Sequence, residues 1–470
     1  MKSYLNKTLN KHWLSILAML SAACYTISSC QKVDNWLDVK SQLNHVRPST
    51  LEDFWALLDE ENRMNRFYPV DGLAGSDNYY LTPENFQAAG DLLQNHYTWK
   101  KDIYNGIVVA DWANRYEVIG RANIVLEGLA KLGTVDDTNF KYIKGTALFF
   151  RAINFYNLAQ SYSLPFSNEN ISLPGIVLRL TSDVNVPSVR SSIEETYQQI
   201  IRDISLAIDL LPLSSGYQTR PNKAAALILL AKTYLVMGDY EHALQRSDQC
   251  LSLSDGLLDY NSNLIKPSST YRFPAFPGNP EVQFFARGTS NRSIGPQTNA
   301  YGYVDSLLYQ SYDVNDLRKS LIYNNSGNGK IQFRGSYTGE NTIFAGLATN
   351  EAYLIRMECA ARLGNIKQAL ADLNHLLINR YRKGTFLPYQ IDDKDALLRL
   401  ILLERRKELP FTAQIRWEDL RRLNLQAEFA KTLIRKISGI TYELPPNDKR
   451  YALPIPDKEI QLSGIPQNER

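Results

Sequence analysis

The chain has 470 residues, and its 52 Lys and Arg against 49 Asp and Glu give a formal net charge of +3. This near-neutral balance argues against nucleic acid as a ligand, because neutralising several phosphates requires a concentrated excess of basic residues. With 44% hydrophobic and 21% charged residues, the composition is that of an ordered globular protein. The four Cys exclude a disulfide-dense scaffold, and since no two of them have Cys-x-x-Cys spacing, no zinc site of that type is expected.

Residues 1–29 are predicted to be a lipoprotein signal peptide. A basic start is followed by an apolar run over residues 14–23, which is shorter than the about 20 residues that span a bilayer. The residues Ile-Ser-Ser-Cys at 27–30 fit a lipobox, so we expect Cys30 to be lipidated and to tether the mature protein. Ordinary signal-peptidase cleavage near Ala23 is the alternative.

The remaining residues, 30–470, are predicted to form a single, mainly α domain. Apolar side chains recur at helical spacing, as in Tyr116–Leu129, where Ile119 and Ala122 share one face. The helical core is expected at about 50–65, 112–160, 193–252 and 350–435. The connections at about 67–100 and 256–345 are rich in Pro, Gly, Asn and Ser and are expected to be loop-rich insertions with little β structure.

A short pattern occurs twice and indicates tetratricopeptide-like helical hairpins. Gly238-Asp239 follows an Ala-rich helix and is followed by Ala243, and Gly364-Asn365 is followed in the same way by Ala369. Glycine permits the tight bend between two helices, and alanine permits their close approach. We therefore expect helical hairpins to form the scaffold.

The block at residues 404–422, together with other motifs, resembles a known protein family. This block contains Glu-Arg-Arg-Lys-Glu-Leu at 404–409 and Arg-Trp-Glu-Asp-Leu-Arg-Arg at 416–422. Together with Trp112-x-x-x-Tyr116-x-x-Ile119-x-x-Ala122-Asn123 and Pro454-Ile455-Pro456, it resembles the SusD/RagB family of outer-membrane nutrient-binding lipoproteins. The resemblance covers nearly all of residues 30–468.

The carboxylates of the 404–422 block raise the question of a glycosidase, in which two carboxyl groups flank the scissile bond. Arginines alternate with these carboxylates, and a neighbouring guanidinium keeps a carboxylate ionised, whereas a general acid must be protonated at neutral pH. Catalysis is therefore not indicated. We expect a structural ion-pair network, formed by Glu404, Arg405, Arg406, Arg416 and Asp419.

The resemblance implies a surface lipoprotein that captures a nutrient, most often an oligosaccharide. It implies delivery to a SusC-like TonB-dependent transporter in the outer membrane. We expect contact to the membrane through the lipid anchor only, and the sequence predicts no cofactor and no metal ligands. Sugar capture requires aromatic rings for the C–H faces and polar groups for the hydroxyls. The densest such group is Asp77, Asn78, Tyr79 and Tyr80, with Trp99 beyond it.

In the family, ligand residues tend to lie in this N-terminal region and in the central insertion, which adds Tyr271, Tyr301 and Tyr303 as candidates. For each aromatic residue the alternative is packing of a loop onto a helix. Two other functions stay open: a tetratricopeptide-type scaffold that docks proteins, and a family member that captures peptides. A binding protein should expose aromatic residues on its loops, whereas a scaffold should expose a bare helical groove.

Overall fold

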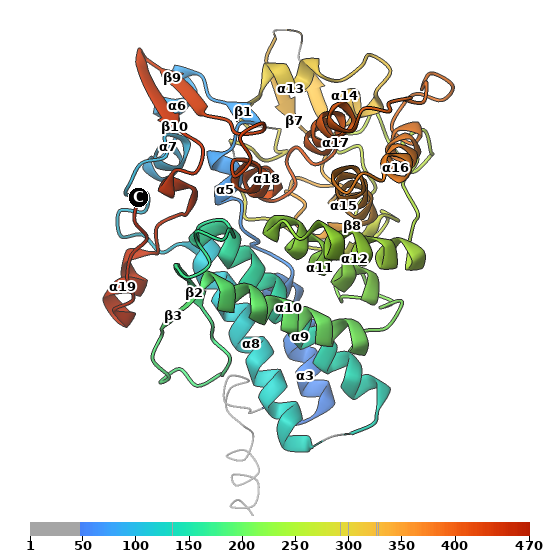
Figure 1. Ribbon diagram of the computed structural model, residues 1–470. Coiled ribbons are helices and arrows are strands. Elements are labelled where there is room, and N and C mark those ends of the chain that lie inside the picture. The colour runs from blue at the N-terminus through green and yellow to red at the C-terminus, as the bar shows by residue number, and fades with distance from the viewer. Residues whose placement is uncertain (1–47, 134, 292, 299, 326, 328) are drawn as a thin grey trace, which may run out of the picture. The chain divides into compact units, whose positions relative to one another are not determined.

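The structure is a stack of antiparallel α-helices to which short strand pairs and long loops are attached (Figure 1). This computed structural model describes residues 48–470 except 134, 292, 299, 326 and 328. The predicted signal peptide and Cys30 therefore lie outside the described residues. Residues Thr50–Arg470 form one compact unit. About 47% of the described residues are helical, which confirms the prediction of a mainly α fold with little β structure.

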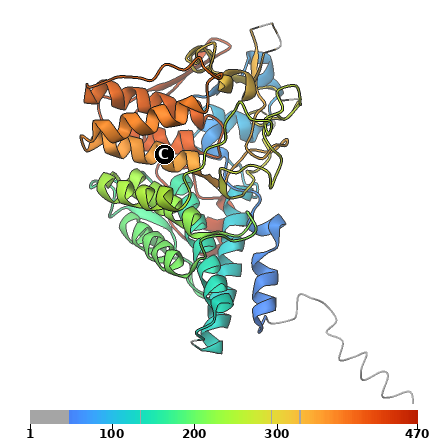
Figure 2. The same cartoon turned by 90° about the vertical axis from the view of Figure 1, so that its right-hand side faces the viewer.

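Long helices carry the stack, and neighbours along the chain pack against one another. They are α8 (Ala110–Leu132), α9 (Thr138–Tyr162), α10 (Ile193–Leu210), α11 (Lys223–Met237), α12 (Tyr240–Leu253), α15 (Thr349–Arg362), α16 (Ile366–Ile378) and α17 (Lys394–Glu408). Helix α12 also packs against α15, so the hairpins α11–α12 and α15–α16 lie next to each other (Figure 2).

Local sequence explains where these helices begin. The hydroxyl of Ser192 accepts a hydrogen bond from the N–H of Glu195, and the Glu195 carboxylate accepts one from the N–H of Ser192, a capping box at α10. The Asp137 carboxylate caps α9 by accepting from the N–H of Phe140. Each cap satisfies a backbone donor that has no partner inside the helix.

The two predicted hairpin turns have the same geometry. Gly238 and Gly364 adopt φ values of 78° and 83°, which favour glycine. The N–H of the following residue, Asp239 or Asn365, donates to a carbonyl five residues earlier, and its side chain caps the next helix. Both alanines of the pattern are fully buried, at Ala243 and Ala369. The tetratricopeptide-like turns are confirmed.

The stretch 67–100, expected to be loop-rich, contains short helices. Before α8 the chain forms α3 (Leu51–Leu58), α4 (Glu61–Met64), α5 (Asp71–Gly75), β1 (Tyr79–Tyr80), α6 (Pro83–Ala88) and α7 (Asp91–Tyr97). Helix α6 begins with Pro83, whose missing N–H costs nothing in a first turn, and the Thr82 hydroxyl caps it. Short helices therefore form in this turn-rich stretch where their first turns are capped.

The central insertion carries short strands and helices between its loops. They are β4 (Val282–Phe284), β5 (Tyr303–Val304), α13 (Ser306–Gln310), α14 (Leu317–Leu321), β6 (Tyr323–Asn325), β7 (Ile331–Phe333) and β8 (Leu347–Ala348). The described strands pair antiparallel, in the combinations β1–β5, β4–β8, β6–β7, β2 (Pro174–Val177) with β3 (Arg190–Ser192), and β9 (Leu433–Ile437) with β10 (Ile440–Leu444). The β1–β5 pair joins the insertion to the N-terminal region, and the β4–β8 pair brings the two flanks of the insertion together.

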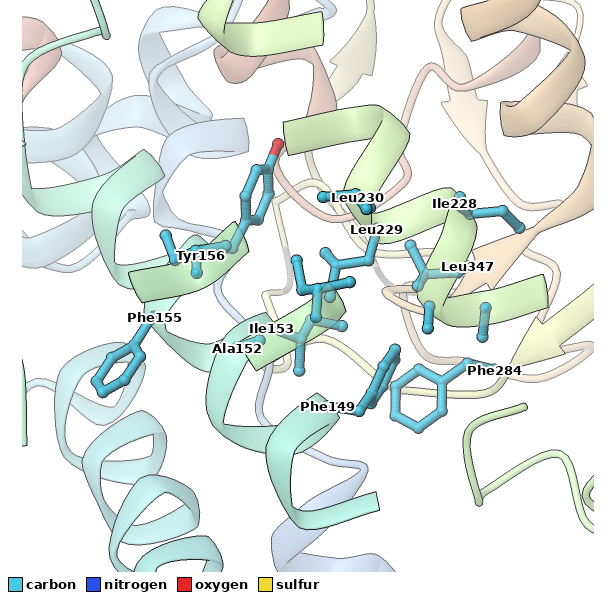
Figure 3. Packing of buried hydrophobic residues seen from close by; sticks show 14 of the residues in the cluster. Phe149, Ala152, Ile153, Phe155, Tyr156, Ile228, Leu229, Leu230, Phe284 and Leu347 are labelled. Atoms are coloured by element: carbon cyan, nitrogen blue, oxygen red, sulfur yellow. The ribbon is translucent and has the colours of Figure 1, made fainter. Parts of the chain in front are cut away.

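The core anchors the insertion to the helices (Figure 3). Phe284 of β4 packs edge-on against Phe149 and Phe150 of α9, with ring centroids 5.0 and 5.7 Å apart. Ile228–Leu230 of α11 and Leu347 of β8 belong to the same buried cluster. Burying one such side chain stabilises the fold by roughly 1.5–3 kcal/mol, so the loops are held by the helical core rather than by their own hydrogen bonds alone.

The C-terminal region is less helical than expected. The helical core, expected to reach about residue 435, ends at Leu423 with α18 (Ile415–Leu423), and the β9–β10 hairpin follows. The chain then forms the short 3₁₀-helix η2 (Lys449–Tyr451) and α19 (Asp457–Ser463). Across the part of the chain that the structure describes, no helix is long and apolar enough to cross a membrane.

Candidate ligand-binding site

The pairing of β1 with β5 brings two of the predicted residues together. Tyr80 lies opposite Tyr303, with ring centroids 5.7 Å apart and ring planes inclined by 46°. Tyr80 is 38% exposed and Tyr303 is half-buried. We call these two residues the tyrosine pair. Because one comes from the N-terminal region and the other from the central insertion, a single surface joins both candidate regions.

Gly302 allows the chain that leads into β5 to pass close to the backbone of Ser293. A Cβ atom at Gly302 would lie 1.9 Å from the carbonyl oxygen of Ser293, so a larger residue requires the backbone to move. Next to it, the backbone carbonyl of Tyr301 accepts a hydrogen bond from Nδ2 of Asn85 at 2.6 Å. The Asn85 hydrogen bond ties the residue before Gly302 to α6, and the half-buried side chain of Tyr301 packs against the buried cluster that contains Tyr79.

Charged groups lie next to the tyrosine pair. Nζ of Lys330 lies 5.3 Å from the ring centroid of Tyr303, within cation–π distance. The pKa of the exposed Glu84 is lowered, first by hydrogen bonds from its own backbone N–H and from Thr82 and then by the charge of Lys330. Aromatic rings with an ammonium and a carboxylate beside them suit a polyhydroxylated ligand, because the rings contact its C–H faces and the polar groups bind its hydroxyls.

The predicted ligand residues Asp77 and Asn78 form ion pairs and hydrogen bonds within the fold. Nε of Arg416 lies 2.7 Å from Oδ1 of Asp77, and Nζ of Lys431 lies 2.7 Å from Oδ2. Burial alone would raise the pKa of Asp77, but Arg416, Arg406 and Lys431 hold it well below its usual range. Asn78 is fully buried and accepts a hydrogen bond from Nε of Arg406 at 2.9 Å. The prediction that these two side chains bind ligand is corrected, since their polar atoms are already paired.

Tyr79 and Trp99 are also buried, at 4% and 2% exposed. Their rings surround the guanidinium of Arg435, whose Cζ lies 5.5 Å from the Tyr79 centroid, 4.7 Å from Trp99 and 3.5 Å from Tyr97. We call these three rings the aromatic cage. Successive side chains of a strand point to opposite faces, so the outward position of Tyr80 turns Tyr79 inward. The expectation that Tyr79 and Trp99 stack on a ligand is therefore corrected.

Tyr271 lies in another part of the insertion. It is half-buried and neighbours Arg334. Among the described residues, no ring contact links Tyr271 to Tyr80 or Tyr303. Of the predicted aromatic residues, the structure thus brings the rings of Tyr80 and Tyr303 into contact, and Tyr271 lies apart from them.

The C-terminal block forms buried ion pairs. Nε of Arg405 lies 2.9 Å from Oδ2 of Asp419, and both side chains are buried. Glu404 pairs with Arg318 at 2.6 Å and with Lys407 at 2.6 Å. The other two arginines of the expected network, Arg406 and Arg416, pair with Asp77. Arg318 and Asp77 lie far from this block in the sequence, so the ion pairs connect three segments of the chain.

Electrostatics in this network oppose acid catalysis. Burial would raise the pKa of Glu408, but Arg380 and Arg318 hold it at about 2. The pKa of Asp419 is lowered in the same way, because Arg405, Arg422 and Arg416 outweigh the effect of burial. A general acid at neutral pH needs a raised pKa. These carboxylates are ionised and engaged in structural pairs.

A cavity of about 390 Å³ lies elsewhere, between the α11–α12 turn, the end of α15 and α18. Two of its lining residues, Arg362 and Arg422, both bind the buried carboxylate of Glu358, so their charges are compensated within the fold.

In the described ranges, no group of three or more His, Cys, Asp or Glu has an arrangement that holds a metal ion.

Sequence reasoning missed two features. Arg435 occupies an inward position of β9, where Leu433 and Ile437 are also buried, and a charged residue at such a position signals a buried partner. Arg220, Trp55 and Tyr217 form a surface cluster from segments that are unremarkable in sequence. No local pattern predicts this second cluster, because Trp55 lies far along the chain from Tyr217 and Arg220.

Comparison with known proteins identifies the family. A family model described as "Starch-binding associating with outer membrane" matches residues 35–235, and the SusD family model matches residues 347–469. The chain is 25% identical over 427 residues to SusD-like protein P2 of Formosa agariphila, an alignment that covers 78% of this chain and 80% of that protein.

Solved structures share the fold. A protein from Bacteroides vulgatus, described as a putative sugar binding protein, is 20% identical, covers 90% of this chain and 99% of its own, and superposes with a TM-score of 0.72. A SusD superfamily protein from Bacteroides thetaiotaomicron is 22% identical, with 90% and 100% coverage and a TM-score of 0.70. The two family models, the relative in sequence and the common fold agree, and the chain belongs to the SusD/RagB family.

Proposed function

We propose that this protein captures an oligosaccharide at the cell surface and passes it to a SusC-like TonB-dependent transporter in the outer membrane. The observation that carries this proposal is the tyrosine pair, an aromatic surface formed by β1 and β5 where Tyr80 is open to solvent. The descriptions of relatives support it, since one matching family is called starch-binding and one structural neighbour is described as sugar binding.

In this proposal the two rings contact the apolar faces of a sugar, while Glu84 and Lys330 bind hydroxyl groups. A carboxylate accepts a hydrogen bond from a hydroxyl, and an ammonium donates one to a hydroxyl oxygen. Glu84 and Lys330 can therefore pair with sugar hydroxyls acting as donors and as acceptors. The β1–β5 pairing holds the rings before ligand arrives, which lowers the entropy cost of binding. The protein acts as a binding module rather than an enzyme.

Attachment to the membrane is proposed to occur through a lipid at Cys30. A diacylglyceryl group together with an N-acyl chain gives stable anchoring, whereas a single chain binds reversibly. About 20 residues of the sequence separate Cys30 from Thr50, the first residue of the compact unit.

The proposal is tested by calorimetric titration of a panel of gluco-, galacto-, manno- and xylo-oligosaccharides. We expect Tyr303→Ala and Tyr80→Ala to weaken binding about five-fold or more, since each removes one stacking ring. Tyr80→Phe keeps the ring and should bind within about two-fold of the wild type. Because Tyr80 is exposed, its removal leaves no cavity, and the melting temperature should not change.

Tyr79→Phe is the matched control from the same strand, because it changes a buried tyrosine on the opposite face. It should leave affinity unchanged. If wild type binds no sugar but binds peptides in a parallel titration, and Tyr80→Ala abolishes that binding, the site captures peptide instead. If neither class binds, the proposal fails, and a protein-docking scaffold becomes the function to test.

A further inference from the structure

We propose that the surface around Tyr217 is a second carbohydrate-binding site, distinct from the tyrosine pair. This inference rests on the proposed function, because it assumes that the protein binds glycans. The surface is built from α3, α9 and the loop that joins α10 to α11. In Figure 1, α3 and β1 lie at different levels of the helical stack, so the two surfaces use separate elements.

Three aromatic rings converge on one guanidinium at this surface. Cζ of Arg220 lies 3.8 Å from the ring centroid of Trp55, 5.2 Å from that of Tyr217 and 5.9 Å from that of Tyr142. Trp55 and Tyr142 meet edge to face, with centroids 4.8 Å apart. We call these four residues the Arg220 stack.

Polar contacts fix the stack in position. Nε of Arg220 donates to Oδ1 of Asp59 at 2.7 Å, and Nη2 donates to Oδ2, a bidentate pair. Nε1 of Trp55 donates to Oδ1 of Asn139 at 2.7 Å, which ties α3 to α9. The rings and the polar groups are therefore held in place before any ligand binds, which reduces the ordering cost of association.

The outer part of the stack is open to solvent. Tyr217 is 65% exposed, and the side chains of Arg220 and Asp59 are 22% and 36% exposed. The ring of Tyr217 offers an apolar face, with a carboxylate that accepts and a guanidinium that donates beside it. A sugar ring presents the complementary surfaces, C–H bonds on one face and hydroxyls at the edge.

Size and charge favour a sugar over a protein at this place. In residues 211–222, the large apolar side chains that are exposed are Leu213 and Tyr217. A stable protein interface buries about 800 Å² on each partner, far more than one ring and one leucine provide. The charges of Arg220 and Asp59 compensate each other, so a neutral hydroxylated ligand fits better than an ion.

The test combines titration with hydrogen exchange on the full chain, using the same oligosaccharide panel and the corresponding polysaccharides. We expect a glycan that binds the wild type to slow amide exchange in residues 211–222. Tyr217→Ala should weaken binding of that glycan about five-fold or more, while Tyr217→Phe stays within about two-fold. Since Tyr217 is exposed, neither variant should change the melting temperature, and Arg220→Lys should weaken binding because it loses the bidentate, stacking guanidinium.

The outcomes separate this inference from the proposed function. If Tyr303→Ala weakens binding while Tyr217→Ala binds every glycan as wild type does and residues 211–222 show no protection, the second site is refuted and the proposed function stands. If no glycan protects either surface in the wild type, both fail. If Tyr217→Ala leaves sugar binding intact but loses co-purification with the transporter, the surface docks protein and the inference is again overturned.

Discussion

The guanidinium of Arg435 lies 3.5 Å from the ring centroid of Tyr97, and Trp99 and Tyr79 complete the enclosure. Its N–H groups donate to the backbone carbonyls of Tyr97 and Ser76. This aromatic cage therefore joins β9 to α7 and to the segment that leads into β1. It lies on the inward side of the strand whose outward residue is Tyr80, so the cage supports the proposed ligand surface without forming part of it.

Removing a ring of the cage should cost stability rather than affinity. We expect Trp99→Ala to lower the free energy of unfolding by roughly 3–5 kcal/mol, because a large buried side chain leaves a cavity. Urea unfolding measures this, with the exposed Tyr80→Ala as the matched control that should stay within about 0.5 kcal/mol. Wild-type stability of Trp99→Ala together with lost sugar binding would contradict the cage.

The ion pair between Arg405 and Asp419 should behave as a structural unit. Removing one partner leaves a buried charge without compensation, so Arg405→Ala and Asp419→Ala should each cost roughly 3–5 kcal/mol. The double variant with apolar replacements, Arg405→Met and Asp419→Leu, should recover part of that loss because no charge remains buried. Thermal melts distinguish this structural role from a ligand-binding role. A binding role predicts an unchanged melting temperature together with weaker ligand binding.

Asp111 forms a buried junction near the start of α8. Its Oδ2 accepts from the backbone N–H of Val70 at 2.9 Å and of Asp71 at 3.2 Å, and Oδ1 accepts from the Thr289 hydroxyl at 2.6 Å. Burial, and then the nearby charge of Asp71, raise the pKa of Asp111 to about 7. Ionising this group inside the fold is thus less favourable than in the unfolded chain, where its pKa is near 3.9.

Because the pKa of Asp111 is raised in the folded state, its contribution to the stability of the fold is complete below its pKa in the unfolded chain. That contribution is lost as the pH rises through about 7. We expect the contribution of Asp111 to lower the free energy of unfolding by about 2–3 kcal/mol between pH 5 and pH 8. The span from pH 5 to the folded pKa of about 7 is two units, at about 1.4 kcal/mol each. Urea unfolding of wild type and Asp111→Asn at both pH values isolates this contribution. A difference between the two proteins that does not change with pH would refute it.

The predicted lipid anchor is tested at Cys30. Without the thiol no lipid is attached, so Cys30→Ala should leave the membrane fraction or stay unprocessed. Fractionation with immunoblotting measures both outcomes, and Cys24→Ala is the matched control, since Cys24 lacks a lipobox. A Cys30→Ala protein that still pellets with membranes at wild-type size and yield would disprove lipidation at this residue.

Much of the fold follows from the sequence alone, because helices and their turns depend on local spacing. Gly238 and Gly364 mark the hairpin turns, since a left-handed backbone there favours glycine, and the apolar period of α8 and α10 places their buried faces. The burial of the 404–422 carboxylates among arginines follows from their alternation. The motifs also predict the SusD/RagB family, which the comparison with known proteins confirms.

Only the tertiary structure separates Tyr80 from Tyr79. In the sequence they are equivalent neighbours, but the pairing of β1 with β5 turns one ring to solvent and the other toward Arg435, more than 350 residues away in the chain. Asp77 and Trp99 are assigned to the interior for the same reason, since Arg416 and Arg435 reach them from the C-terminal region. Exposure and ion pairing depend on contacts between distant segments, and local sequence carries no record of which segments will meet.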